Sequence, residues 1–260
     1  MVLDRIIGQD LLTTKPDVGL FLGFVFTLIG FATSYLIFVS GMSIAMIGFS
    51  SLLMLPYIIK IMKPESSQYA PVFSRKNPSL EFFAFLFLGM ALAYTILFGI
   101  LSPGIRDLAF DNQLDVIAGR AAATAGSFID TGFFMSIFSN NILIVAIAVI
   151  LSYFYGAGAI FVLNYNASIA GIVYGSWISA LLWPAGPLAP FASTNIMLFL
   201  PHTILEILGY LLASVAGIIL SKPLTRRNSR PIERDVAILV AASGGLILVG
   251  ALVEVIVPFL

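Results

Sequence analysis

Long apolar runs separated by short polar stretches dominate the pattern of this chain. All but one of the runs have 18 to 24 residues and are rich in Leu, Ile, Val, Phe and Ala, so they are long enough to cross a bilayer as helices. They lack the ten-residue alternation of an outer-membrane strand. The pattern predicts seven spans, at about 18–40, 42–62, 80–101, 140–155, 159–182, 200–220 and 236–257.

The stretches between these runs have the composition of exposed connections. Residues 1–17 mix polar and apolar positions, which predicts a short interfacial helix, whereas Pro, Ser and charge predict a loop at 63–79. The polar stretch 102–132 predicts a short surface helix near 114–125. The fourth run has only about 16 residues. It and the fifth run are therefore also compatible with broken or re-entrant helices buried in protein.

Composition indicates an all-α polytopic helix bundle in the cell membrane. Hydrophobic residues make up 60% of the chain and charged residues 10%, which leaves too little polar surface for a soluble particle of this length. No charge-led apolar segment with a small-residue cleavage site begins the chain, so we expect the first span to direct insertion. The absence of cysteine excludes disulfides and thiolate metal sites. A net charge near zero gives no signal for nucleic-acid binding.

The distribution of positive charge predicts the orientation. With the N-terminus inside, only Arg106 and Arg120 of the 13 Lys and Arg residues face outward. Cytoplasmic loops carry an excess of Lys and Arg, so this bias predicts an inside N-terminus and an outside C-terminus. The residues on the cytoplasmic side are then Arg5, Lys15, Lys60, Lys63, Arg75, Lys76, Lys222, Arg226, Arg227, Arg230 and Arg234.

Small residues follow one face in the fourth, fifth and sixth spans. Such faces let helix backbones approach closely, and amides can hydrogen-bond across the contact. We therefore expect these three spans to pack on one another. The residues assigned to this packing are Gly156, Gly158, Gly171, Gly175, Gly209, Ala213 and Gly217.

One turn of the sixth span contains the only histidine of the chain, His202, and a carboxylate four residues later, Glu206. Residues at this spacing share one helix face. Ionisable groups at membrane depth are expensive, which makes them a functional-site hypothesis. With the nearby amides, the candidate polar cluster comprises His202, Glu206, Asn140, Asn141, Asn164 and Asn166.

Three interpretations of this cluster are open. A metal pair would lack further ligands, because the chain has no second His, no Cys and no HExxH motif. A proton or cation pathway would use Glu206 as the titrating group and the amides as oxygen ligands. The third interpretation, which we favour, is structural. Pro201 is suited to the start of a helix, and Glu206 benefits from the positive end of the helix dipole. Glu254, near the end of the last span, is expected to reach the headgroups.

Motifs of known enzymes are missing from the sequence. There is no Gly-rich phosphate loop, no GxSxG and no pair of membrane aspartates of a rhomboid- or presenilin-like protease. Ser and His never occur in an arrangement typical of a nucleophile. We therefore expect no enzymatic activity and no cofactor.

The order of four motifs resembles the stage II sporulation protein M family, particularly its archaeal members. These motifs are Asn140-Asn141, Gly156-Ala157-Gly158, the stretch from Leu163 to Gly171, and Pro201-His202-Thr203-Ile204-Leu205-Glu206. The chain departs from the family where Ala167 replaces the Gly after Asn, and where Thr203 replaces the Gly after His. The similarity covers about residues 80–257. It divides the chain into an N-terminal part, 1–79, with two added spans, and a five-span core, 80–260.

The resemblance implies a membrane scaffold or remodelling protein. In spore-forming bacteria the family member is a membrane component of the engulfment machinery that recruits peptidoglycan-degrading partners, but the sporulation role does not transfer to this chain. The partners expected are the lipid bilayer and other membrane or extracytoplasmic proteins. A channel or transporter for a small ion or solute is the alternative. The small residues Gly89, Ala93, Gly244, Gly245 and Gly250 suit a homodimer or internal packing equally well.

Overall fold

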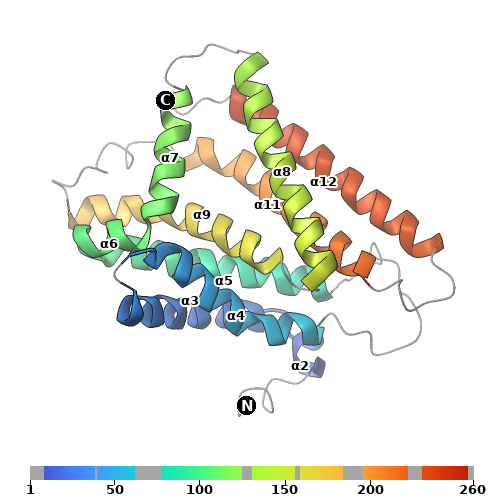
Figure 1. The fold of residues 1–260 in the computed structure, drawn as a ribbon, viewed down its shortest axis with the longest axis horizontal. Coiled ribbons are helices and arrows are strands. Elements are labelled where there is room, and N and C mark those ends of the chain that lie inside the picture. Colours follow the sequence, from blue (N-terminus) through green and yellow to red (C-terminus); the bar gives the residue numbers. More distant parts are fainter. Residues whose placement is uncertain are drawn as a thin grey trace.

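The molecule is built from α-helices, which confirms the expected all-α class (Figure 1). The computed structural model describes residues 9–38, 40–61, 78–124, 131–155, 159–183, 196–221 and 230–256. The helices are α2 (Gln9–Thr14), α3 (Val18–Ile37), α4 (Met42–Ile61), α5 (Pro78–Ile100), α6 (Pro103–Ala109), α7 (Asp111–Thr124), α8 (Thr131–Tyr155), α9 (Ala159–Leu182), α11 (Ile196–Ser221) and α12 (Arg230–Ile256).

Five of these helices, α3, α4, α5, α8 and α12, are long and apolar enough to cross a membrane. The protein is therefore a membrane protein. Helices α9 and α11 have 24 and 26 residues, which at 1.5 Å per residue spans about 36 to 39 Å. Both helices carry buried polar side chains, Asn164 in α9 and Glu206 in α11, and α11 contains the shorter apolar stretch His202–Gly217.

Several helix boundaries differ from the sequence-based prediction, most of all at α8, and one helix, α6, is additional. Helix α8 begins at Thr131, nine residues before the predicted start, and its 25 residues remove the reason to expect a short or re-entrant fourth span. Residues 131–139 mix apolar with small polar residues, so the apolar run did not extend to the true start of the helix. The stretch contains no proline that would prevent a helix there. Helix α6 was not predicted. It begins with Pro103 after an extended Ser102, a position where the missing N–H of proline leaves no bond unmade.

The helices form two groups. Helix α5 packs most extensively on α9 and α3, and α4 completes this first group by packing on α3 and α9. In the second group α11 lies between α8 and α12 and contacts both (Figure 1). The predicted contacts among the fourth, fifth and sixth spans, which are α8, α9 and α11, are all present, although those of α9 with the other two are small. Helix α8 does pack on α11, but the main partner of α9 is α5.

Close backbone approaches explain this grouping. A Cβ added to Gly175 of α9 would lie 2.6 Å from the carbonyl oxygen of Thr95 in α5. Gly171 of α9 similarly approaches Tyr94 of α5. In α11, Gly209 faces Ile247 of α12, whereas Gly217 faces Val149 of α8. The small residues of α9 therefore pack against α5, whereas those of α11 pack against both α12 and α8. Ala213 is fully buried, and Gly156 and Gly158 lie outside the described residues.

The N-terminal hairpin of α3 and α4 is continuous with the rest of the bundle. Gly41, with φ of +68°, provides the left-handed conformation for the turn before α4. The hairpin then packs on α5 and α9 rather than standing apart. The division into 1–79 and 80–260 stays a prediction.

Helices α6 and α7 close one end of the bundle, and we call this the α6–α7 end. Asp111, the first residue of α7, accepts a 2.5 Å hydrogen bond from the Ser43 hydroxyl at the start of α4. Gln113 donates its amide to Ser168 of α9 at 3.0 Å. Arg106 of α6 is fully buried, lies 5.2 Å from the Phe98 ring centre and donates to the Ser179 hydroxyl. These contacts fix the two short helices across α4, α5 and α9.

The close approach at Gly175 can be tested against a matched glycine. We expect Gly175→Ala to destabilise the protein by about 1–3 kcal/mol, because the new methyl group would overlap a backbone carbonyl. Gly244→Ala, where a Cβ meets nothing within 4 Å, should be neutral or slightly stabilising. Thermal denaturation in detergent measures both. Equal effects would contradict the packing of α9 on α5.

The hydrogen bonds to Asp111 predict a pH dependence. Partial burial raises the pKa of this carboxyl group, but the bonds from Ser43 and Asn112 outweigh it and hold the pKa below its ordinary value. A depressed pKa contributes stability above the unfolded value of about 3.9, and the contribution disappears as pH falls through the folded value. Asp111→Asn should flatten the fall of the denaturation midpoint that the wild type shows below about pH 5. Asp115→Asn, at an exposed carboxylate one turn later, should not.

Candidate functional site

The structure divides the six predicted polar residues between two separate clusters and the surface. Asn141, His202 and Glu206 lie in the second helix group, where α8 and α11 meet. Asn164 lies in the first group, where α9 faces α4 and α5. Asn166 is half-buried between the groups, and Asn140 is exposed.

The Glu206 cluster consists of Asn141, His202, Glu206 and Tyr210. Asn141 of α8 donates its amide to Glu206 Oε1 at 2.5 Å, and the Tyr210 hydroxyl donates to Asn141 Oδ1 at 2.8 Å. The three side chains are 0%, 7% and 1% exposed, in the order Asn141, Glu206, Tyr210, so the amide bridges two groups that are removed from solvent. The donor and the acceptor of the Asn141 side-chain amide on α8 are thus both hydrogen-bonded to residues of α11. This arrangement joins the two helices at the level of the carboxylate.

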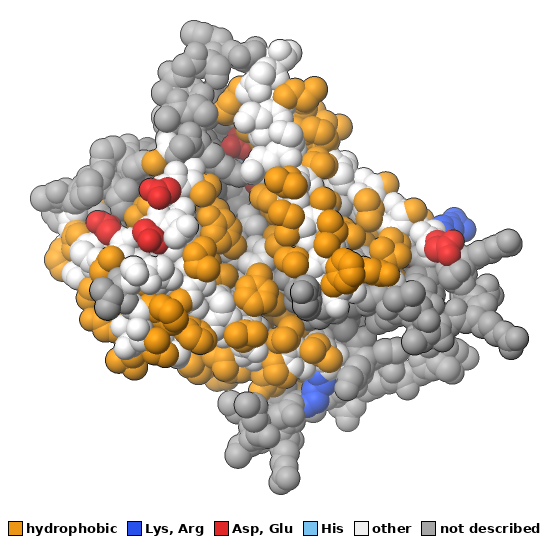
Figure 2. Space-filling view, viewed as in Figure 1, with side chains coloured by type: hydrophobic (Ala, Val, Ile, Leu, Met, Phe, Trp, Pro, Cys, Tyr) orange, Lys and Arg blue, Asp and Glu red, His pale blue; other side chains and the backbone are white. Residues whose placement is uncertain are grey.

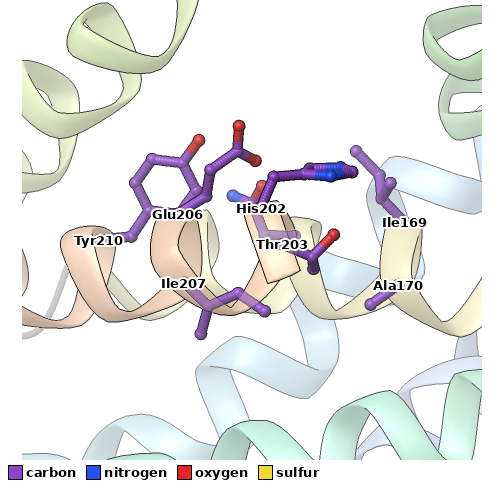
Figure 3. A pocket seen from close by; sticks show the side chains of 8 residues that line it. Ile169, Ala170, His202, Thr203, Glu206, Ile207 and Tyr210 are labelled. Atoms are coloured by element: carbon purple, nitrogen blue, oxygen red, sulfur yellow. The ribbon is translucent and has the colours of Figure 1, made fainter. Parts of the chain in front are cut away.

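The spacing of four residues on α11 explains why these side chains meet. His202, Glu206 and Tyr210 follow one helix face, as the sequence predicted for the first two. Figure 3 shows the Glu206 carboxyl and the Tyr210 ring side by side, whereas the His202 ring extends toward Ile169 of α9. Helix α12 also adjoins Glu206, and its backbone can approach the Glu206 side chain closely because residue 250 is a glycine. A Cβ at this glycine would lie 3.3 Å from Glu206 Cγ.

A small cavity of about 20 Å³ lies beside the carboxylate (Figure 3). It has room for about one water molecule. The Thr203 hydroxyl is buried at its edge and has no hydrogen-bond partner among the described residues. The lining residues are Asn166, Ile169, Ala170, His202, Thr203, Glu206, Ile207 and Tyr210. The site can therefore hold a single small polar species.

The Asn164 cluster joins three helices of the first group. The Asn164 amide donates to the hydroxyls of Ser50 and Ser51 at 2.7 and 2.9 Å and lies 3.1 Å from the carbonyl oxygen of Ile47. Its Oδ1 accepts a 2.9 Å bond from the hydroxyl of Tyr94, a fully buried residue of α5. One asparagine of α9 thereby ties α4 to α5.

Three other residues differ from their predicted places. Asn166 donates its amide to the Val162 carbonyl of its own helix at 2.8 Å and reaches the Glu206 cluster only across the cavity. Asn140 contributes nothing to either cluster. Glu254 was expected to reach the headgroups, but it is 3% exposed on the buried face of α12. It follows Gly250 by one turn, and that face is turned toward α11.

Sequence analysis missed the aromatic members of both clusters. Tyr210 stands four residues after Glu206, and this spacing was the available signal. Tyr94 had no such signal, because its partner Asn164 is 70 residues away in sequence. The Ser50-Ser51 pair in an apolar run was a further sign of an interhelical hydrogen bond.

Among the residues that the structure describes, no three His, Cys, Asp or Glu side chains are grouped so that they could hold a metal ion. The chemistry within reach of the Glu206 cluster is hydrogen bonding and proton exchange at Glu206 and His202. A buried carboxylate bonded to an amide and close to a tyrosine is suited to holding helices together.

The bridge through Asn141 can be tested by removing one hydroxyl. We expect Tyr210→Phe to lower the free energy of unfolding by about 1–2 kcal/mol, since it leaves Asn141 Oδ1 buried without its donor. Tyr174→Phe on α9 is the matched control, because that side chain is half-buried and its hydroxyl has no hydrogen-bond partner among the described residues. Chemical denaturation in detergent measures both. Similar losses in the two variants would contradict the bridge.

Comparison with known proteins identifies the family. The family description "Stage II sporulation protein M" matches residues 79–257, which is more than half of the chain and includes α5 through α12. No curated protein and no solved structure gave a match. Both clusters contain residues from this region, and the His202–Glu206 turn lies within it. The chain belongs to the stage II sporulation protein M family.

Proposed function

We propose that this protein is a non-enzymatic integral membrane scaffold of the stage II sporulation protein M type. The observation that carries the proposal is the use of the buried polar side chains. Asn141, Glu206 and Tyr210 bond to one another between helices, and the cavity beside them admits about one water molecule. These groups stabilise helix contacts, and the space left is too small for a solute.

The proposal includes seven spans and an inside N-terminus in the cell membrane. Helices α9 and α11 are as long as the five apolar helices and pack beside them, which supports seven crossings. Exposed acidic residues such as Asp107 and Asp115 lie at the α6–α7 end, whereas Lys60 and Arg234 belong to helix ends away from it. Figure 2 shows acidic side chains on the side where α6 and α7 lie, and basic side chains on the opposite side with a further acidic group next to them, with apolar surface between. The basic side would face the cytoplasm.

A scaffold needs a rigid surface on which partners can assemble. Helices α6 and α7 offer one outside the bilayer, because Arg106, Asp111 and Gln113 anchor them to three spans. We place the binding of membrane or extracytoplasmic partner proteins on this end.

The experiment that separates a scaffold from a transporter uses Glu206→Gln in liposomes. The wild-type protein should conduct H⁺, Na⁺ and K⁺ no faster than protein-free vesicles, and the variant should lose thermal stability with no change in flux. Glu233→Gln, at an exposed carboxylate on α12, is the matched control and should alter neither property. A flux that the Glu206 variant abolishes and the Glu233 variant retains would contradict the proposal and favour the transporter alternative.

A second arm tests the partner surface. Because the chain contains no cysteine, a single Asp115→Cys substitution carries a crosslinker on the exposed face of α7. In intact cells this position should give adducts with specific partner proteins, whereas Leu88→Cys, exposed on the apolar surface of α5, should not. Equal adducts at both positions would contradict the assignment of partner binding to the α6–α7 end.

A further inference from the structure

The exposed face of α8 is unusual for a helix at membrane depth. Helix α8 is the least buried of the five apolar helices, and its outward positions recur at helical spacing along its whole length. Large apolar residues occupy the second half of this face, as expected for contact with lipid. The first half is different. Besides the exposed Met135 it carries Gly132, Ser136, Ser139 and Asn140, all exposed.

Asn140 is the polar group that lipid cannot satisfy. Its side chain is exposed, and the structure gives it no hydrogen bond to any described residue. Fifteen residues separate it from the end of α8 at Tyr155, a rise of about 22 Å, whereas the hydrocarbon core is about 30 Å thick. The amide therefore lies within the bilayer. Polar groups at this depth need a partner from protein.

The neighbouring Ser139 has no such need. Its hydroxyl donates to the carbonyl oxygen of Ser136 in the same helix at 3.2 Å. Asn141, the next residue, is turned inward and is used by the Glu206 cluster. Of the two adjacent asparagines, one therefore locks the bundle and the other faces outward.

We propose that this face of α8 is the interface with a second copy of the chain, in which the two Asn140 amides pair across a two-fold axis. A carboxamide has both a donor and an acceptor, so it is complementary to an identical carboxamide. In a two-fold contact the same patch meets itself, and two copies inserted in the same direction bring the two α8 helices side by side in parallel. Gly132 and Ser136 are small enough for the backbones to approach closely near the amides.

The other small-residue faces fit this role less well. Gly89 is used against the Leu20 backbone of α3, Ala93 is fully buried, and Gly250 faces Glu206. Gly244 and Gly245 of α12 have open space around them, but the exposed strip there, which includes Ala241 and Leu248, carries no side chain that requires a hydrogen bond. This exposed strip of α12 is therefore the alternative dimer interface against which the experiment compares α8.

Single cysteines in this cysteine-free chain test the interface in membranes. Under mild oxidation, Ser136→Cys and Leu143→Cys on α8 should form disulfide-linked dimers, and Ala241→Cys and Gly245→Cys on α12 should not. Absence of dimers from the α8 positions, stronger dimers from α12, or an adduct between Ser136→Cys and a different protein would each overturn the proposal.

The amide itself is tested by measuring self-association of labelled protein in lipid bilayers. Asn140→Leu should weaken dimerisation by roughly 3- to 30-fold, the range expected for loss of an interhelical hydrogen bond in a membrane. Asn140→Gln should retain most of the affinity, and Ser139→Ala should leave it unchanged. Unchanged dimerisation of Asn140→Leu would overturn the proposal. These results do not depend on whether the protein acts as a scaffold.

Discussion

Polar side chains inside a bilayer must find hydrogen-bond partners within protein, because the hydrocarbon offers none. In this molecule two asparagines satisfy that requirement in the same way. Asn141 uses both ends of its amide against α11, and Asn164 uses both ends of its amide against α4 and α5. Each asparagine is buried completely and is the centre of one helix group. The hydrogen bonds join α8 to α11 and α9 to α4 and α5, and glycine contacts let the backbones of neighbouring helices approach.

The two clusters give the bundle its internal division. The Asn164 cluster has four hydrogen bonds to neutral groups, which suits a fixed structural joint. The Glu206 cluster instead contains the only histidine and a carboxylate. It adjoins a cavity of about 20 Å³, and the Thr203 hydroxyl at the edge of this cavity has no hydrogen-bond partner among the described residues. Protonation of Glu206 would change the strength of its bond to Asn141. The contact of α8 with α11 therefore contains ionisable side chains, as does the contact of Asp111 with α4.

Local sequence determined much of the fold. Apolar run length located the long apolar helices, and α9 agrees with its predicted bounds at both ends. The spacing of His202 and Glu206 placed both on one buried face. The local sequence did not show which distant helices pack against one another. The seam of Gly171 and Gly175 could have faced any helix, and only the three-dimensional arrangement shows that it meets α5. The same limit applies to Asn140 and Asn141, since adjacent residues of one type differ in environment only once the neighbours of α8 are known.

A double-mutant cycle tests the central claim, that each asparagine locks its own helix group independently. The cycle combines Asn141→Leu with Glu206→Leu and measures the free energy of unfolding in detergent. We expect a coupling energy of about 1–2 kcal/mol between these two sites, because they share one buried hydrogen bond. Asn141→Leu and Asn164→Leu should instead be additive to within about 0.5 kcal/mol. Additivity of the first pair, or equal coupling in the second, would contradict the account.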